Sequence, residues 1–254
     1  MKAIHRIIVL LAALLALAAA TASQARPAAR ITVLAASSLT NVLPQIDASA
    51  KYSFGGSDTL AGQIRLGAPA DVFAAANSSI PDKLYAQGLV EKPVVFTTNK
   101  LVLVTPRANP AGITSVFDLR KAGIKLIVGT PTVPVGSYTR TILKNLALSG
   151  VLSNVVSQET DVRSILGKVA LGEADAGFVY ITDAKTVADK VNVIRLPAWA
   201  QPPIRYEIAI LKSSANRADA VAFINKVLAK AGQAKLRAAG FGAVKKGAAT
   251  YTGG

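Results

Sequence analysis

The stretch ITVLAASSLTN, residues 31–41, decides the fold, because an apolar run leads directly into small residues that carry hydroxyl groups. Residues 31–36 predict a buried strand, and the pattern over residues 39–50 predicts a helix. Strand and helix therefore meet at Ser37 and Ser38. Short apolar runs and amphipathic stretches keep alternating along the chain, which is typical of an α/β protein.

The other predicted elements follow from the same two periodicities, with period 2 for strands and 3.6 for helices. We predict strands over residues 51–54, 71–75, 101–104, 125–128, 176–181, 191–194 and 206–210. We predict helices over residues 59–66, 81–86, 115–119, 137–148, 162–171 and 218–231.

The chain has 254 residues and no long linker, which suits one large domain or two smaller lobes. Without a linker, two lobes must be joined by continuous strands, and residues 100–104 and 205–210 are the natural crossing points. One lobe would then comprise residues 26–100 plus 206–254, and the other residues 101–205. A cleft that closes between two lobes by a hinge is a common way to trap a ligand.

The first 25 residues have the pattern of a cleavable signal peptide. Lys2 and Arg6 precede an apolar run over residues 7–20, and small residues follow at Ala22 and Ala25. The run is shorter than the roughly 20 residues needed to span a bilayer. We therefore expect export to the periplasm, with an uncleaved anchor as the alternative.

The near absence of Cys and His excludes several kinds of catalytic and metal site. The chain has no Cys, and its single His is His5, inside the predicted signal peptide. Disulfides, thiol chemistry, Ser-His-Asp catalysis and zinc sites built on His or Cys are therefore excluded for the exported protein. No P-loop and no GxGxxG motif is present. We expect no catalytic residue and no cofactor.

The formal net charge of +15 raises the question of nucleic-acid binding. Aromatic residues for base stacking make up only 6% of the chain, and no nucleic-acid motif is present. We expect no nucleic-acid partner, and interpret the basic surface as solvated. Its long-range field would attract small anions.

Four junctions between a predicted strand and a predicted helix carry small, hydroxylated or Gly-rich residues: 35–41, 54–60, 129–137 and 159–163. A helix N-terminus offers unpaired N–H groups and the positive end of the helix dipole, so it can bind an anion without a cationic side chain. A single such junction is usually only a helix cap. Four of them, together with Tyr180 on a buried strand, predict an anion pocket.

The same stretches carry a family resemblance. Residues 36–41, residues 53–73, residues 128–138 and residues 161–180 resemble, in order, the motifs of the periplasmic molybdate-binding proteins of ABC transporters. The similarity runs from about residue 31 to residue 241. It implies a two-lobed periplasmic binding protein of type II-like fold, with a mixed sheet flanked by helices in each lobe and a ligand cleft between the lobes.

The resemblance also implies a function and a site. A monomeric protein would capture a tetrahedral oxyanion, molybdate and also tungstate, and deliver it to membrane ABC permease subunits. Ser38 and Ser57 would donate hydroxyl and backbone hydrogen bonds, Val135 and Val162 backbone N–H groups, and Tyr180 its phenolic hydroxyl. These groups would contact the oxygens of the anion, and none would bind the metal atom directly.

Two residues depart from the family pattern. Asp58 stands where relatives have a small neutral residue, and a carboxylate facing a dianion would repel it. Alternatively, Asp58 faces outward and stabilises the first turn of its helix. Glu207 stands where relatives often have Pro; it could pair with Arg205 or another cation, or alter the hinge. Either residue could also indicate a different small anion as the ligand.

Two other classes of function compete with transport. An enzyme could act on a small anionic substrate with Tyr180 and either Asp58 or Asp161 as acid and base. A surface-binding module could use the basic C-terminal part of the chain. The lack of His and Cys speaks against the enzyme, and the ordered motifs speak against the module.

Overall fold

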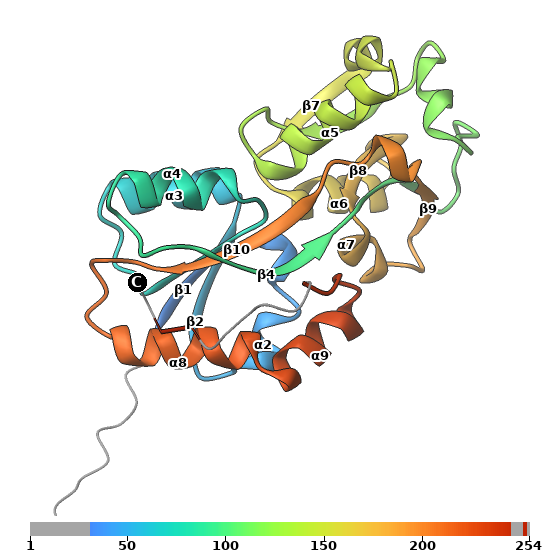
Figure 1. The fold of residues 1–254 in the computed structure, drawn as a ribbon. Coiled ribbons are helices and arrows are strands. Elements are labelled where there is room, and N and C mark those ends of the chain that lie inside the picture. Colours follow the sequence, from blue (N-terminus) through green and yellow to red (C-terminus); the bar gives the residue numbers. More distant parts are fainter. Residues whose placement is uncertain (1–30, 245–250, 253–254) are drawn as a thin grey trace, which may run out of the picture.

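Two five-stranded β-sheets form the framework of the structure, a computed structural model that describes residues 31–244 and 251–252 (Figure 1). Each sheet is mixed and carries its own helices, so the fold is the two-lobed α/β type that the sequence predicts. The predicted signal peptide, residues 1–25, lies outside the described residues.

The first sheet has the strand order β2-β1-β3-β10-β4. Its strands are β1 (Thr32–Ala36), β2 (Lys51–Gly55), β3 (Val72–Ala75), β4 (Val94–Asn99) and β10 (Ile204–Ile210). β1 is parallel to β2 and β3, whereas β10 is antiparallel to β3 and β4. Helices on one side are α3 (Ser57–Arg65) and α4 (Ser79–Ala86); on the other lie α2 (Leu43–Ile46), α8 (Arg217–Leu228) and α9 (Lys230–Ala239) (Figure 1).

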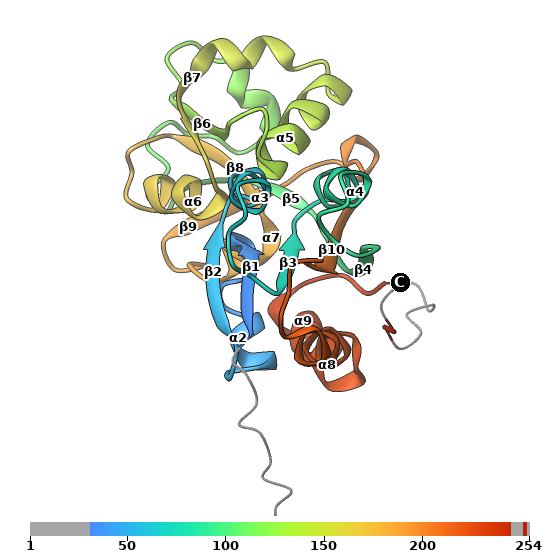
Figure 2. The same ribbon diagram turned by 90° about the vertical axis from the view of Figure 1, so that its left-hand side faces the viewer.

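The second sheet has the order β7-β6-β8-β5-β9 and repeats the same pattern. Its strands are β5 (Leu101–Pro106), β6 (Leu126–Gly129), β7 (Val155–Glu159), β8 (Ala176–Tyr180) and β9 (Val191–Arg195). β6 is parallel to β7 and β8, whereas β5 is antiparallel to β8 and β9. The helices of this lobe are α5 (Pro134–Asn145), α6 (Val162–Ala170) and α7 (Ile181–Lys185). In Figure 2 the arrowheads of β1, β2 and β3 point toward this second lobe.

The position of a strand in its sheet explains whether its sequence is continuously apolar or alternates between apolar and polar residues. β3, β5, β6 and β8 lie inside the sheets and are buried along their whole length, so they read as continuous apolar runs. The edge strands β2 and β7 alternate between more and less exposed positions. Within the described part of the chain, no helix is long and apolar enough to cross a membrane.

The chain crosses between the two sheets twice. Only Lys100 separates the end of β4 from the start of β5, and residues 196–203 lead back from β9 to β10. The side chain of Gln201 joins the two crossings: its Oε1 accepts from the N–H of Leu101 at 2.9 Å, and its Nε2 donates to the carbonyl of Leu101 at 3.1 Å. The two connections are thereby held side by side.

Two predicted helices were wrong in extent. The helix expected over residues 39–50 is a 3₁₀ turn, η1 (Ser37–Leu39), followed by the single turn α2. Pro44 has no N–H to donate to the preceding turn, so a continuous helix cannot pass through it. The helix expected over residues 218–231 ends at Leu228, and α9 begins after the extended residue Ala229.

The lobes touch each other across the cleft. A Cβ atom on Gly56, at the start of α3, would lie 2.1 Å from the carbonyl oxygen of Thr160 in the second lobe. The hydroxyl of Thr132 donates to Asp58 Oδ2 at 2.6 Å, again from one lobe to the other. Lys185 Nζ donates to the carbonyl of Ala238 at 2.8 Å. The structure is therefore a closed form.

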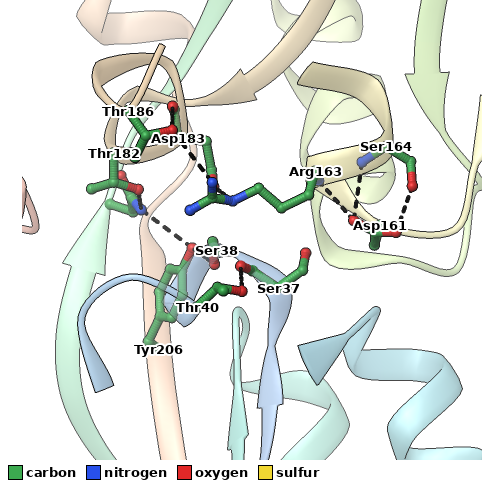
Figure 3. A network of polar contacts seen from close by, with 11 residues as sticks. Ser37, Ser38, Thr40, Asp161, Arg163, Ser164, Thr182, Asp183, Thr186 and Tyr206 are labelled. Atoms are coloured by element: carbon green, nitrogen blue, oxygen red, sulfur yellow. Dashed lines mark hydrogen bonds and ion pairs between the residues drawn. The ribbon is translucent and has the colours of Figure 1, made fainter. Parts of the chain in front are cut away.

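A buried ion pair joins α6 to α7 within the second lobe. Arg163 Nε lies 2.8 Å from Asp183 Oδ1, and the Asp183 side chain is fully buried (Figure 3). The N–H is not aligned with the carboxylate as in a hydrogen bond, so the contact is electrostatic. Burial raises the pKa of Asp183 to about 7, although the positive charge of Arg163 acts in the opposite direction.

Replacing Gly56 by Ala should prevent this closed arrangement without unfolding either lobe. The added methyl group would collide with the backbone of Thr160, which cannot move away as a flexible side chain could. We expect small-angle scattering to report a larger radius of gyration for Gly56→Ala than for the wild type. The matched control is Gly62→Ala in α3, where a Cβ meets nothing within 4 Å. It should keep the wild-type scattering curve and gain about 0.5–1 kcal/mol of stability. Identical curves for all three proteins would contradict the prediction.

The raised pKa of Asp183 predicts a pH dependence of stability. Between the ordinary pKa of an aspartate and about 7, the native state holds a proton that the unfolded state has released. The free energy of unfolding therefore falls as pH rises through this window and levels off above it. Thermal unfolding between about pH 5 and pH 8 at constant ionic strength should show this decline.

The variant Asp183→Asn cannot titrate and should show a shallower decline than the wild type. Some slope should remain, because burial also raises the pKa of Glu207. Equal slopes for the two proteins would show that Asp183 titrates normally in the native state.

Candidate functional site

The carboxyl ends of parallel strands from both sheets meet at one small cavity between the lobes. In the first lobe β1 leads into η1 and β2 leads into α3. In the second lobe β6 leads to α5, β7 leads to α6, and β8 ends at Tyr180. Ligands of open α/β sheets commonly bind outside the carboxyl ends of the strands.

All five predicted site residues line this cavity. Its walls are Ala36, Ser37, Ser38, Gly55, Gly56, Ser57, Ala76, Val133, Pro134, Val135, Asp161, Val162 and Tyr180. The centre of a water-sized sphere has about 10 Å³ in which to move, so the cavity suits one very small ligand. No Lys or Arg lies among its walls.

The first lobe contributes three buried serines to the walls: Ser37 and the two predicted site residues Ser38 and Ser57. Ser57 is the first residue of α3 and is 1% exposed. Its Oγ accepts a hydrogen bond from the N–H of Ala76 at 3.1 Å, which leaves the hydroxyl proton free to be donated. Ser38 lies in η1, is also buried, and has its Oγ 2.9 Å from the hydroxyl of Tyr206.

The second lobe contributes two helix starts. Val135 is the second residue of α5, and it follows Pro134, which has no N–H of its own. Val162 is the first residue of α6. The first N–H groups of a helix have no acceptor within it, so those of Val135 and Val162 are available to a ligand.

Asp161 also lines the cavity, but its carboxylate is occupied. Oδ1 accepts from the N–H groups of Arg163 and Ser164 at 2.7 and 3.1 Å, and Oδ2 accepts from the Ser164 hydroxyl at 2.7 Å (Figure 3). Asp161 is thus the N-cap of α6, with its charge stabilised by the helix start rather than exposed to the cavity.

Tyr180 brings an unused hydroxyl. It is 1% exposed, and its Oη has no hydrogen-bond partner among the described residues. Burial, together with the neighbouring Tyr206, raises its pKa well above the ordinary value, so the hydroxyl stays protonated and can donate. A buried hydroxyl without a partner is costly, and a ligand that accepts its proton would remove that cost.

The two residues that depart from the family pattern are not among those that line the cavity. Asp58 is in the first turn of α3 and does not face outward: its Oδ2 accepts from Thr132, and its Oδ1 is buried without a hydrogen-bond partner among the described residues. Glu207 makes no ion pair within the described residues, so the alternative that it pairs with Arg205 or another cation does not hold there. β10 instead has a register shift between Tyr206 and Glu207, at the returning connection between the lobes. Burial raises the pKa of Glu207.

Sequence reasoning missed three buried polar residues behind Ser38: Tyr206, Asn99 and Thr182. They form a hydrogen-bonded group with the serine (Figure 3). The alternation of Ile204, Tyr206 and Ile208 in a strand is the one local signal that the tyrosine points inward.

The cavity is therefore rich in neutral donors: three hydroxyls on serines, one on a tyrosine, and backbone N–H groups at helix starts. Within the described residues, no group of three His, Asp or Glu side chains could hold a metal ion. The Asp161 carboxylate is bonded to the start of α6, so the groups left for a ligand are mainly donors, which suit a small anion that accepts hydrogen bonds on all sides.

Comparison with known proteins agrees with this architecture. The bacterial extracellular solute-binding protein family matches residues 12–242. The molybdate-binding protein ModA of Mycobacterium tuberculosis is 39% identical over 234 residues, 88% of each chain. ModA of Haemophilus influenzae is 34% identical, over 85% of this chain and 91% of that protein. The solved periplasmic molybdate-binding protein of Azotobacter vinelandii has a TM-score of 0.76 at 26% identity, over 85% of this chain and 100% of the other. The chain belongs to the bacterial extracellular solute-binding protein family.

Proposed function

We propose that this protein is the periplasmic solute-binding component of an ABC importer for molybdate, with tungstate as an alternative ligand. Residues 1–25 would direct export and be removed. Residues 26–100 plus 206–254 would form one lobe, and residues 101–205 the other. The monomeric protein would close on the anion and deliver it to the membrane permease.

The observation that carries the proposal is the convergence of neutral donors from both lobes on one cavity. Ser38 and Ser57 come from one lobe, and Val135, Val162 and Tyr180 from the other. An anion held by both sets stabilises the closed form relative to the open one, because the open form offers only half of the donors. Relatives that are named molybdate-binding proteins support this choice of anion.

An enzymatic role is disfavoured by the same geometry. The acid–base pair would need Tyr180 and either Asp58 or Asp161. Asp58 does not line the cavity, Asp161 caps α6 with both carboxylate oxygens, and the pKa of Tyr180 is raised well above the neutral range. Among the described residues, the cavity therefore offers Tyr180 no uncommitted carboxylate as an acid–base partner.

Titration calorimetry of the exported form against molybdate, tungstate, sulfate and phosphate tests the proposal. We expect molybdate and tungstate to bind with similar affinity, because they have the same charge and shape. Sulfate has the same charge but is smaller, so its oxygens would lie farther from some of the donors and it should bind more weakly. Preference for sulfate or phosphate would identify a different anion, and no response to any tetrahedral anion would refute the proposal.

Removing single donors tests the site. Ser57→Ala and Ser38→Ala should each weaken molybdate binding by about 1.5–3 kcal/mol, the usual contribution of a hydrogen bond to a charged group. Tyr180→Phe should behave in the same way. The control Ser53→Ala changes an exposed serine of β2 and should bind as the wild type does. Wild-type affinity in all three site variants would show that the anion binds elsewhere.

A further inference from the structure

Tyr206 and Asn99 do not line the cavity, yet both are buried directly behind Ser38. Tyr206 is 0% exposed, and its ring packs edge-on against Tyr180, Phe96 and Phe241, with ring centroids 5.5–6.2 Å apart. Packing alone needs no hydroxyl, because phenylalanine would fill the same space. The hydroxyl and its partners therefore require a separate explanation.

The hydrogen bonds around Tyr206 have a defined direction. Asn99 Oδ1 accepts from the N–H of Lys100 at 2.9 Å, which fixes which end of the amide carries the hydrogens. Asn99 Nδ2 then donates to the hydroxyls of Tyr206 at 3.2 Å and Thr182 at 3.0 Å. Since Tyr206 already accepts from Asn99, its own proton is available for Ser38, whose Oγ lies 2.9 Å away.

A bound anion favours the arrangement in which Tyr206 donates its hydroxyl proton to Ser38. If Ser38 donated its proton to Tyr206, it would present only lone pairs to the negative oxygens. If Tyr206 donates to Ser38, the serine keeps its proton for the ligand. Burial raises the pKa of Tyr206 well above its ordinary value, so this proton is retained.

We infer that Tyr206 and Asn99 are positioning residues that orient the Ser38 hydroxyl as a donor toward the bound oxyanion. The inference rests on the proposed function. The relay runs from the backbone of Lys100 through Asn99 and Tyr206 to Ser38, and from there to the ligand.

The relay also joins the ligand to the hinge. Asn99 ends β4 at the first crossing between the lobes, and Tyr206 lies on β10, just after the second crossing. Thr182, the other partner of Asn99, belongs to α7 in the second lobe. The Asn99–Thr182 hydrogen bond therefore links the two lobes, whereas the bonds from Asn99 to Tyr206 and from Tyr206 to Ser38 lie within the first lobe.

A double-mutant cycle tests the inference, with molybdate affinity measured by calorimetry for the wild type, Tyr206→Phe, Ser38→Ala and the double variant. Tyr206→Phe keeps the ring and its packing and should weaken binding by about 2- to 10-fold. If Tyr206 acts through Ser38, the same change in the Ser38→Ala background should cause no further loss. A merely structural role would cost the same factor in both backgrounds.

The matched control is Tyr52→Phe. Its hydroxyl is also partly buried and donates to the carbonyls of Leu43 and Asp47, away from the cavity. It should bind molybdate as the wild type does. Asn99→Asp provides a second variant, because a carboxylate would accept the Tyr206 proton and draw it away from Ser38. It should weaken binding more than Tyr206→Phe does, because its negative charge also repels the anion whether or not Ser38 is present.

The possible outcomes separate the two claims. No binding of molybdate or another tetrahedral anion by the wild type would refute the proposed function. Binding by the wild type that is weakened by Ser38→Ala but unchanged by Tyr206→Phe would refute the relay alone. An equal loss from Tyr206→Phe with and without Ser38 would also refute it.

Discussion

The first peptide N–H groups of a helix have no acceptor within that helix, and in this protein helix starts from both lobes line the same cavity. In each sheet the parallel strands end on one edge, and a helix or turn begins just beyond. The first N–H groups of α5 and α6 have no acceptor within their helices, and the hydroxyl of Tyr180 has no hydrogen-bond partner among the described residues. A small anion would satisfy all of them together, so the proposed recognition needs no Lys or Arg.

Closure and recognition depend on each other through a few short contacts. Gly56 allows the backbone of one lobe to approach Thr160 of the other, and Thr132 reaches across to Asp58. Asp58, whose carboxylate would repel an anion if it faced the ligand, thus accepts a hydrogen bond that joins the two lobes. The resulting cavity is so small that its size and donor number, rather than its net charge, would decide which anion fits.

Local sequence patterns predict much of this arrangement, and its failures have physical causes. Strand–helix junctions are local, so Ser38 and the helix starts could be named from the sequence, with the family resemblance supplying their roles. The edge strands β4 and β7 were both missed. β4 has only three apolar residues in a row, residues 94–96. In β7, Val156 is exposed while the polar Ser157 and Glu159 are half-buried, so no polar–apolar alternation marks the strand. Pro44 divides a helix that amphipathic spacing alone predicts to be continuous. Tyr206 was missed as part of the site, because it meets Ser38 across 168 positions of sequence and only where the chain crosses between lobes.

In the proposed site, Val135 and Val162 would contribute their peptide N–H groups rather than their side chains. A mutation changes a side chain and leaves the peptide N–H in place, with proline as the exception. Both side chains are buried in the core, so evolution can exchange them for other apolar residues that fit the space while the peptide groups are kept. The serines and the tyrosine have no such freedom. Substitutions at the two valines would leave the anion-binding groups in place, whereas substitutions at the serines or the tyrosine would remove donors and change which anion binds.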